Sequence, residues 1–289
     1  MRRRTAAACG AMAELWASAF VLADQPIPPD SDVETAFHGT FNNGEDITRP
    51  VNIFQLRQRY QRLPDDNGRE PEKWTTTLRA DLRTDLAESW TLYGRVDQPL
   101  VGSDDVTSRF NPEGHSRFGQ GDLLTELAII APPSTARIGY GLGVRAIWPT
   151  AGLNEAGNGK YQLGPVAGVR YSLPEISPGS FVLPQVIYLN SVASRNGNKD
   201  HPDVNQLYIQ PKFNISLPDD WFLAAYASEN IQINYEDEGK VFVPFDLMFG
   251  KKLFGTFVAS RSFPIRSTMR VDSSRTDGNW KGVWGITSK

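Results

Sequence analysis

The sequence predicts an all-β protein: a transmembrane, antiparallel, up-and-down β-barrel of about twelve strands. Apolar and polar residues alternate with a period of two along many segments, short and long connections alternate between these segments, and tryptophans stand at segment ends. The 289 residues are enough for one barrel, and no composition break or long linker indicates a second globular domain.

The period-two alternation is clearest in the segments 76–86, 90–97, 137–148, 206–217 and 241–249. It is less regular in further expected strands, which are 52–62, 122–131, 161–173, 181–193, 221–235, 256–265 and 279–288. In 181–193 both faces carry apolar residues, so the pattern does not assign that segment an orientation. No stretch with helical period and caps interrupts the series, which argues against α/β architecture.

The connections between these segments differ in length in a regular way. Short ones are 85–89, 132–135, 174–180, 218–220 and 253–255; longer polar ones are 63–73, 101–119, 151–160, 194–204 and 267–278, and 236–239 is a brief exception. Barrels of bacterial outer membranes have short periplasmic turns and longer external loops. The alternation therefore favours a membrane barrel with both termini on the periplasmic side.

The N-terminal residues 1–23 are predicted to be a signal peptide. Three arginines, Arg2 to Arg4, precede a mostly apolar stretch that ends in small residues before Asp24, and Glu14 is the one charge inside it. An amphipathic N-terminal helix is the alternative. We expect a polar periplasmic leader over 24–49 and the barrel over 50–289. The single cysteine, Cys9, lies in the signal segment, so a mature chain without it has no disulfide or cysteine metal site.

Composition excludes some classes of protein. A formal net charge of −3 and a pI of about 5.7 provide no basic surface for nucleic acid. The mean hydropathy is −0.38, and no apolar run long enough for a membrane-spanning helix follows the N-terminus. A barrel strand exposes only every second residue to lipid, so its hydropathy signal is weak.

Alternation alone does not decide which face of a barrel is apolar. A soluble barrel points its apolar residues inward, whereas a membrane barrel points them toward lipid. The signal peptide, the loop lengths and the tryptophans favour the second arrangement, which makes the charged face the lumen. The expected lumen-lining residues are Arg57, Arg59, Arg79, Asp81, Arg83, Arg95, Asp97, Glu126, Arg145 and Arg170. We favour a stabilising network for them over a cationic constriction that selects solutes.

Four tryptophans are expected at the membrane interfaces, where a ring that is partly apolar and partly polar is favoured. Trp90 and Trp221 follow short turns, and Trp74 and Trp148 border long loops. The alternative is that they pack inside a soluble barrel.

Catalysis, cofactors and metals find little support, so we predict a protein that is not an enzyme, with no cofactor and no metal. The three histidines, His38, His115 and His201, lie in predicted loops or the leader, and no Gly-x-Ser-x-Gly motif is present. His115 beside Ser116 is more readily explained as a solvated loop residue. The acidic runs 104–105 and 236–238 are surface Ca²⁺ candidates that are better explained as solvated charge. Gly139, Gly141 and Gly143 precede a strand, so they are no dinucleotide fingerprint.

Several short motifs occur in the order found in the outer-membrane family named for the meta-pathway of phenol degradation. They are Asp46-Ile47-Thr48-Arg49-Pro50 before Phe54-Gln55-Leu56-Arg57, Gly94-Arg95-Val96-Asp97-Gln98-Pro99-Leu100, Gly119-Gln120-Gly121-Asp122, Gly141-Leu142-Gly143 leading to Trp148-Pro149-Thr150-Ala151, Lys160-Tyr161-Gln162-Leu163-Gly164-Pro165, Pro184-Gln185, and Val243-Pro244-Phe245 with Gly250-Lys251. Across 46–253 the chain resembles this family. The sequence departs from the pattern at its end, where Gly285-Ile286-Thr287-Ser288-Lys289 has no terminal aromatic residue.

The resemblance implies a barrel of the bacterial outer membrane with a role in uptake of small hydrophobic or aromatic compounds, and no catalytic residues. We therefore predict a passive channel or transporter. Its expected partners are outer-membrane lipid, a small-molecule solute and the barrel assembly machinery, and no nucleic acid. The alternatives are a structural outer-membrane barrel with a plugged lumen and a soluble, lipocalin-like binding barrel.

Overall fold

The protein is all-β, as the sequence predicted, and its strands join one antiparallel sheet. The computed structural model describes residues 15–19, 46–62, 71–86, 89–105, 111–132, 137–195, 201–227, 229–253 and 257–267. Within these ranges, the one helical element with defined bounds is the short 3-10 turn η2, Asn154–Ala156. The predicted strand 279–288 and His38 lie outside the described residues.

The described chain contains fourteen strands. They are β1 (Leu15–Ala19), β2 (Ile53–Arg62), β3 (Glu72–Asp85), β4 (Thr91–Ser103), β5 (Arg117–Gln120), β6 (Leu123–Ile130), β7 (Ile138–Trp148), β8 (Lys160–Ser172), β9 (Phe181–Ser194), β10 (Asn205–Ser216), β11 (Trp221–Ala225), β12 (Ile231–Asn234), β13 (Lys240–Leu253) and β14 (Phe257–Ser267).

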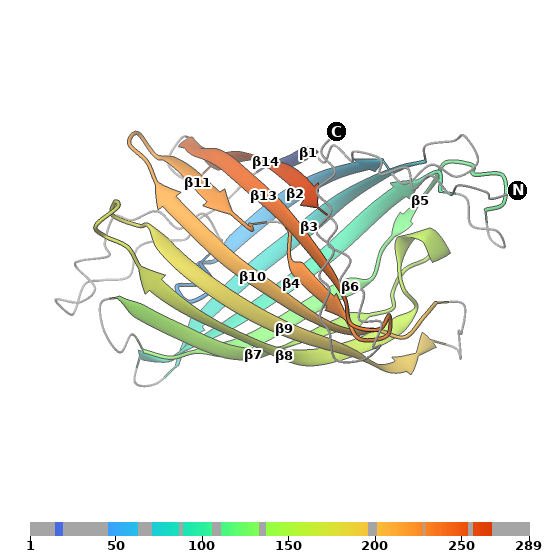
Figure 1. Ribbon diagram of the computed structural model, residues 1–289, viewed down its shortest axis with the longest axis horizontal. Coiled ribbons are helices and arrows are strands. Elements are labelled where there is room, and N and C mark those ends of the chain that lie inside the picture. The colour runs from blue at the N-terminus through green and yellow to red at the C-terminus, as the bar shows by residue number, and fades with distance from the viewer. Residues whose placement is uncertain are drawn as a thin grey trace, which may run out of the picture.

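Neighbours in the sheet largely follow chain order. From β2 the pairings run through β3, β4, β6, β7, β8 and β9 to β10. Next to β10 lie β11 and β12, which share one position in the sheet and both pair with β13. β13 pairs with β14, and β1 pairs with both β14 and β2. Figure 1 shows that this sheet is strongly curled, with β9, β10 and β13 in front of β3 and β4.

Most expected strands coincide with observed ones, namely those of β2, β3, β4, β6 to β10, β11 with β12, β13 and β14. Three details differ. The segment expected as a loop at 101–119 carries the end of β4 and the start of β5, which pair as a hairpin. The segment expected as one strand at 221–235 is broken into β11 and β12. Leu15–Ala19, within the predicted signal peptide, forms β1.

Most strands whose side chains are described have a more buried face and a more exposed face. In β8 burial alternates along the whole strand: Gln162, Val166 and Arg170 are buried, whereas Leu163 and Val169 are exposed. Successive side chains of a strand point to opposite faces, so this is the expected consequence of a curled sheet with one covered side. We call the covered side the inner face and the exposed side the outer face.

The strand that the sequence could not orient, β9, follows the same rule. Its residues Phe181, Leu183 and Ile187 are buried on the inner face, and Val186 and Val192 are exposed on the outer face. Both faces of β9 are apolar because its inner residues belong to apolar clusters inside the curled sheet.

Connections of different length lie at opposite ends of the strands. The short connections β3–β4, β6–β7, β8–β9, β10–β11 and β13–β14 share one end, here called the turn end. The longer ones share the other, here called the loop end, where the brief connection β12–β13 also lies, as the exception at 236–239 predicted. The turn between β10 and β11 places Asp219 and Asp220 at φ of 56° and 62°. Aspartate tolerates this left-handed conformation better than most residues, and consecutive positive φ values suit a tight hairpin.

Candidate functional site

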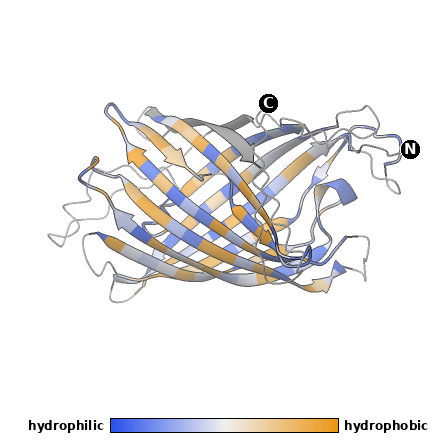
Figure 2. Cartoon of the chain, viewed as in Figure 1, coloured by the Kyte–Doolittle hydropathy of each residue, from blue (hydrophilic) through white to orange (hydrophobic). Residues whose placement is uncertain are grey.

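The outer face of the sheet is apolar around its described strands. Exposed large hydrophobic residues occur on β2, β3, β4, β6, β7, β8, β9 and β13, and Leu142 on β7 is 65% exposed. Figure 2 shows them alternating with hydrophilic residues along the strands. The inner face is where most of the buried charge lies. This distribution is the reverse of that in a soluble β-barrel, whose apolar residues point inward.

All ten residues predicted to line the lumen lie on the inner face. Six are buried (Arg57, Asp81, Arg95, Asp97, Glu126 and Arg170), and the other four are half-buried (Arg59, Arg79, Arg83 and Arg145). They come from β2, β3, β4, β6, β7 and β8. The period of two was sufficient to place them on one face.

Four of these residues form a continuous row across four neighbouring strands. Asp81 of β3 lies opposite Arg95 of β4, which lies opposite Glu126 of β6, which lies opposite Arg145 of β7. We call these four residues the charge row. Its charges alternate in sign from strand to strand, so each carboxylate has an arginine directly across the ladder. Opposite charges at directly paired positions stabilise a sheet, whereas like charges destabilise it.

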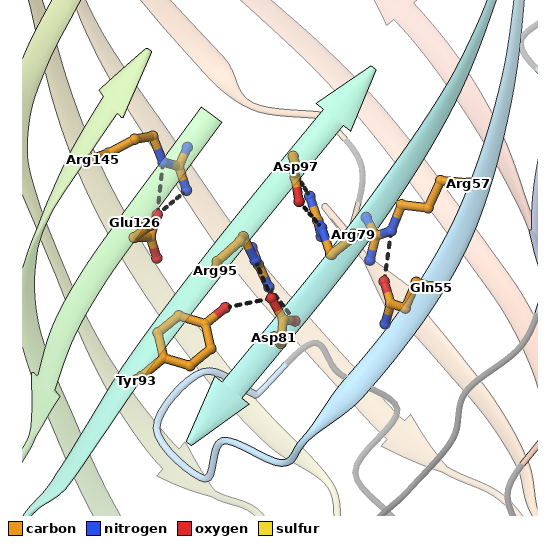
Figure 3. A network of polar contacts seen from close by, with 9 residues as sticks. All are labelled: Gln55, Arg57, Arg79, Asp81, Tyr93, Arg95, Asp97, Glu126 and Arg145. Atoms are coloured by element: carbon orange, nitrogen blue, oxygen red, sulfur yellow. Dashed lines mark hydrogen bonds and ion pairs between the residues drawn. The ribbon is translucent and has the colours of Figure 1, made fainter. Parts of the chain in front are cut away.

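The contacts within and beside the charge row are close and directional (Figure 3). Arg95 donates from Nε to Asp81 Oδ1 at 2.7 Å and from a terminal nitrogen to Oδ2 at 2.9 Å, and the Tyr93 hydroxyl donates to Oδ1 at 3.0 Å. Arg145 donates from Nε to Glu126 at 2.7 Å. In the adjacent row, Arg79 binds Asp97 through two nitrogens, at 2.7 and 2.5 Å. Two-point arginine–carboxylate contacts fix both distance and angle.

A third ion pair connects β2 to the residues between β11 and β12, where the sheet position next to β10 is interrupted. Between β11 and β12 the chain leaves the sheet, and Glu229 turns to the inner face, where Arg59 donates to its carboxylate at 2.7 Å. The Glu229 backbone N–H donates to the buried carboxylate of Asp246 on β13. Arg59 was predicted from the sequence, whereas Glu229, Asp246 and Tyr93 were missed. The acidic residue inside an otherwise apolar predicted strand was the available signal for Glu229.

A second structural feature of the inner face is the segment Asp46–Pro50, which precedes β2 and which we call the inner segment. The Asp46 carboxylate is buried, accepts hydrogen bonds from Thr48 at 3.0 Å (N–H) and 2.7 Å (hydroxyl), and pairs with Arg49 at 2.7 Å. The guanidinium of Arg170 on β8 lies 3.5 Å from it. The predicted leader over 24–49 therefore has its last four residues on the inner face, and 24–45 lie outside the described residues.

The electrostatics of Asp46 depend on these neighbours. Burial alone would raise the pKa of its carboxyl group, but Arg49, Arg170 and the hydrogen bonds from Thr48 and Arg49 together hold the pKa below its ordinary value of 3.8. The charged form of Asp46 thus stabilises the docked inner segment at neutral pH.

The apolar residue of the inner segment is also docked. Ile47 is 4% exposed and belongs to a buried cluster with Tyr93, Ala128, Ile130, Phe181 and Leu183, which come from β4, β6 and β9. Thr48 lies against Gly139 of β7, where a Cβ atom would be 3.0 Å from the threonine hydroxyl. A Cβ atom at position 139 would therefore be in tight contact with Thr48, which would have to shift by a few tenths of an ångström.

The loop end of the interior carries its own polar contacts. Arg117 donates to the buried Glu155 carboxylate at 3.2 Å, and Lys73 donates to the Glu155 carbonyl oxygen at 3.1 Å. Asp122 accepts from the backbone of Ala151 at 3.1 Å and of Asn158 at 2.6 Å. These bonds fix the loop that contains η2 to the inner side of β3 and β5. The sequence predicted only a long polar loop at 151–160, and the inward contact of Glu155 was missed.

The four tryptophans predicted at membrane interfaces lie near strand ends on the outer face, and each is partly exposed. Trp90 and Trp221 are at the turn end, and Trp74 and Trp148 are at the loop end. Trp221 stacks on Phe249 with 4.6 Å between ring centroids, and Trp148 meets Tyr161 edge to face at 6.4 Å. None of the four is packed on the inner face.

The residues considered for catalysis and metal binding are dispersed. His115 contacts Glu113 at 2.6 Å with both side chains 75% exposed, and His201 contacts Asn154. Asp104 accepts from the Glu72 backbone, and Asp237 pairs with Lys240. Among the described residues, no group of three or more His, Cys, Asp or Glu side chains is placed to hold a metal ion. In the same part of the chain, no helix is long and apolar enough to cross a membrane.

Comparison with known proteins identifies no relative: no protein-family model, curated protein or solved structure matches the chain. The resemblance to the phenol meta-pathway family therefore stays a prediction.

Replacing Asp81 by leucine is expected to destabilise the protein by about 3–5 kcal/mol, because Arg95 stays buried without its counter-charge. The double variant Asp81→Leu with Arg95→Met removes both charges and should recover much of this loss. The measurement is denaturant unfolding followed by tryptophan fluorescence. Asp85→Asn, at the exposed Arg83–Asp85 pair, is the control and should cost less than about 1 kcal/mol. Equal losses for the single and double variants would contradict direct pairing.

The contribution of Asp46 to stability should depend on pH. Because its pKa is lower in the folded than in the unfolded chain, the contribution is fully present above the ordinary value of 3.8 and is lost as pH falls through the lowered pKa. Asp46→Asn should therefore be less stable than the parent at pH 7 by about 1–3 kcal/mol and nearly equal to it under strongly acidic conditions. Unfolding free energies at several pH values test this. A difference that does not change with pH would rule out the ionised contact.

Proposed function

We propose that this chain is a closed β-barrel of a bacterial outer membrane and that it conducts small solutes passively. The observation that carries the proposal is the polarity of the two faces: a charged inner face and an apolar outer face. In water such an outer face would be unfavourable, since large exposed apolar patches usually mark contact with lipid or protein. In a bilayer it is the expected surface.

Closure of the sheet is supported by its pairings. The pairings from β6 through β7 and β8 to β9 carry the curled sheet from β3 and β4 at the back of Figure 1 to β9 and β10 at the front. β1 pairs with β14 on one side and β2 on the other, which places the last described strand near the first long one; because β1 lies in the predicted signal peptide, closure of a cleaved chain requires β2 and β14 to pair directly. A lipid-facing sheet must close, because unpaired backbone groups of an open edge are costly in hydrocarbon.

The height of the apolar outer surface also fits a bilayer. On β8 the exposed aromatic residues Tyr161 and Tyr171 lie ten residues apart, with exposed Leu163 and Val169 between them. Ten residues at about 3.3 Å each extend about 33 Å along the strand. With the usual barrel tilt of about 40° this gives a height of about 25 Å, the typical apolar band of outer-membrane barrels. The four tryptophans are at the borders of this band.

Conduction is supported by the partial exposure of charged side chains on the inner face. The side chains of Arg79 and Arg145 are each 14% exposed and that of Arg59 is 22% exposed, although all three are ion-paired on the inner face. These side chains therefore border space on the inner face that is large enough for water. A charged, solvated interior suits solutes with a polar or charged group better than purely hydrophobic ones. It also disfavours the lipocalin-like alternative, which binds its ligand in an apolar interior.

The second candidate, a structural barrel with a plugged lumen, is favoured by the inner segment. Asp46 and Ile47 occupy the interior at the turn end and are held there by charge and apolar contacts. Both candidates share the same membrane barrel and differ in whether this segment leaves.

The membrane surface is tested by Leu142→Arg, which places a charge on the outer face midway along β7. In a bilayer the substitution should cost about 2–4 kcal/mol, whereas Ile138→Arg, at the turn end of the same strand, should cost about 0–1 kcal/mol. The measurement is unfolding in urea from lipid vesicles, with the heat-dependent gel shift reporting the folded barrel. Equal and negligible costs at both positions would indicate a water-facing surface.

Conduction is tested with the purified full chain in planar bilayers. We expect discrete conductance steps and, in vesicles, permeability to small solutes. A protein that inserts and shows the gel shift but passes no ions and no solutes would favour the plugged structural barrel.

A further inference from the structure

The inner segment crosses the interior instead of following the wall. Asp46 contacts Arg170 on β8, and the Pro50 carbonyl oxygen accepts from Arg83 on β3 at 3.3 Å. In the sheet, β3 and β8 are separated by β4, β6 and β7. Five residues therefore extend across the inner side of five strands near the turn end, and Thr48 touches β7 on the way.

The site that receives this segment has two parts with different chemistry. One is cationic: the Arg170 guanidinium, 4% exposed, faces the Asp46 carboxylate. The other is apolar and takes the Ile47 side chain among Tyr93, Ile130 and Phe181. The two residues that fill these parts, Asp46 and Ile47, are adjacent in the sequence. A carboxylate joined to a compact apolar group matches both at once.

We propose that the inner segment is a pseudoligand, and that the site it fills binds a small carboxylate carrying an apolar group, which displaces the segment and opens the turn end. This inference rests on the proposed membrane barrel and specifies its solute class and its gate. The solute carboxylate takes the place of Asp46 on Arg170, and its apolar group takes the place of Ile47.

The inner segment is joined covalently to β2, and this link sets the concentration at which a free solute competes with the segment for its site. A segment held by a short stretch of chain has an effective concentration of the order of millimolar at its own site. A free solute with similar contacts therefore competes only at millimolar concentration or above. The exchange shifts the equilibrium only because solute binds the open state and not the closed one.

The displacement is measurable by cross-linking. A Cβ atom at position 139 would lie 3.3 Å from the Thr48 Cβ, slightly closer than the usual disulfide separation of about 3.5–4.5 Å. In the full chain with Cys9→Ser, the pair Thr48→Cys and Gly139→Cys should oxidise readily to a disulfide. Sodium benzoate at about 10 mM should slow this oxidation at least about twofold, because a short tether competes at millimolar concentration.

Two control solutes and two variants identify the chemistry that the site recognises. Benzyl alcohol, which has the ring without the carboxylate, and acetate, which has the carboxylate without the ring, should leave the oxidation rate unchanged. Arg170→Gln in the same background should abolish the benzoate effect. Arg137→Gln, which removes an exposed turn arginine paired with Glu175, should retain it.

The conductance of the protein that carries the same two cysteines tests whether the inner segment acts as a gate. The oxidised protein should conduct less than the reduced protein and should not respond to benzoate, and reduction should restore both. A benzoate-insensitive oxidation rate, or equal conductance before and after reduction, would overturn the proposal. The cross-linking assay does not require the protein to conduct, so the proposed site and the proposed channel can fail separately. Benzoate protection in a protein that never conducts would support the site, overturn its role as a gate and refute the proposed channel.

Discussion

Pairing of charge on the inner face is the constraint on which the rest of the structure depends. Asp81, Arg95, Glu126 and Arg145 lie in one row across β3, β4, β6 and β7, each opposite a charge of the other sign. Shifting one strand by a single residue would turn its charges to the outer face and its apolar residues inward. The charge row therefore fixes the register of four strands together, and with it the face that each outer leucine and valine occupies.

The interior is layered because charge and apolar groups are separated along the strands. Two apolar clusters, one around Ile47 and one around Ile53, lie toward the turn end, the charge row and its neighbours occupy the middle, and a third cluster around Val166 lies toward the loop end. Arg170 lies at the turn end beside the cluster around Ile47, because it pairs with Gly139 and is two residues from the end of β8. The inner segment can therefore place Ile47 in the apolar cluster and Asp46 against Arg170 at adjacent positions.

Much of this arrangement follows from sequence, and the part that does not has a physical reason. A period of two assigns a face, so the alternation alone placed Arg57, Asp97 and Glu126 on one common face, and the loop lengths, the predicted signal peptide and the tryptophans identified that face as the inner one. The period of two does not tell which residues pair across the ladder, because that depends on the register of the strands. Nor does it predict the ion pair of Arg170 with Asp46, which depends on the inner segment crossing the interior. The contact of the Tyr93 hydroxyl with Asp81 was missed for the same reason, because it exists only in register. The orientation of β9 also depended on tertiary contacts, since both of its faces are apolar.

The break between β11 and β12 shows how the inner charges shape the wall itself. Three residues of β10, 210–212, face five residues of the neighbouring strand position, 226–230, so two extra residues leave the ladder. Pro211 and Pro244 on the two flanking strands have no N–H to donate at this level, which lowers the cost of interrupting the pairing there. The extra residues turn Glu229 inward to Arg59 and place its N–H on Asp246. In register, the β3 residue opposite Arg59 of β2 is Thr75, which carries no charge, and the interruption brings the Glu229 carboxylate to this arginine.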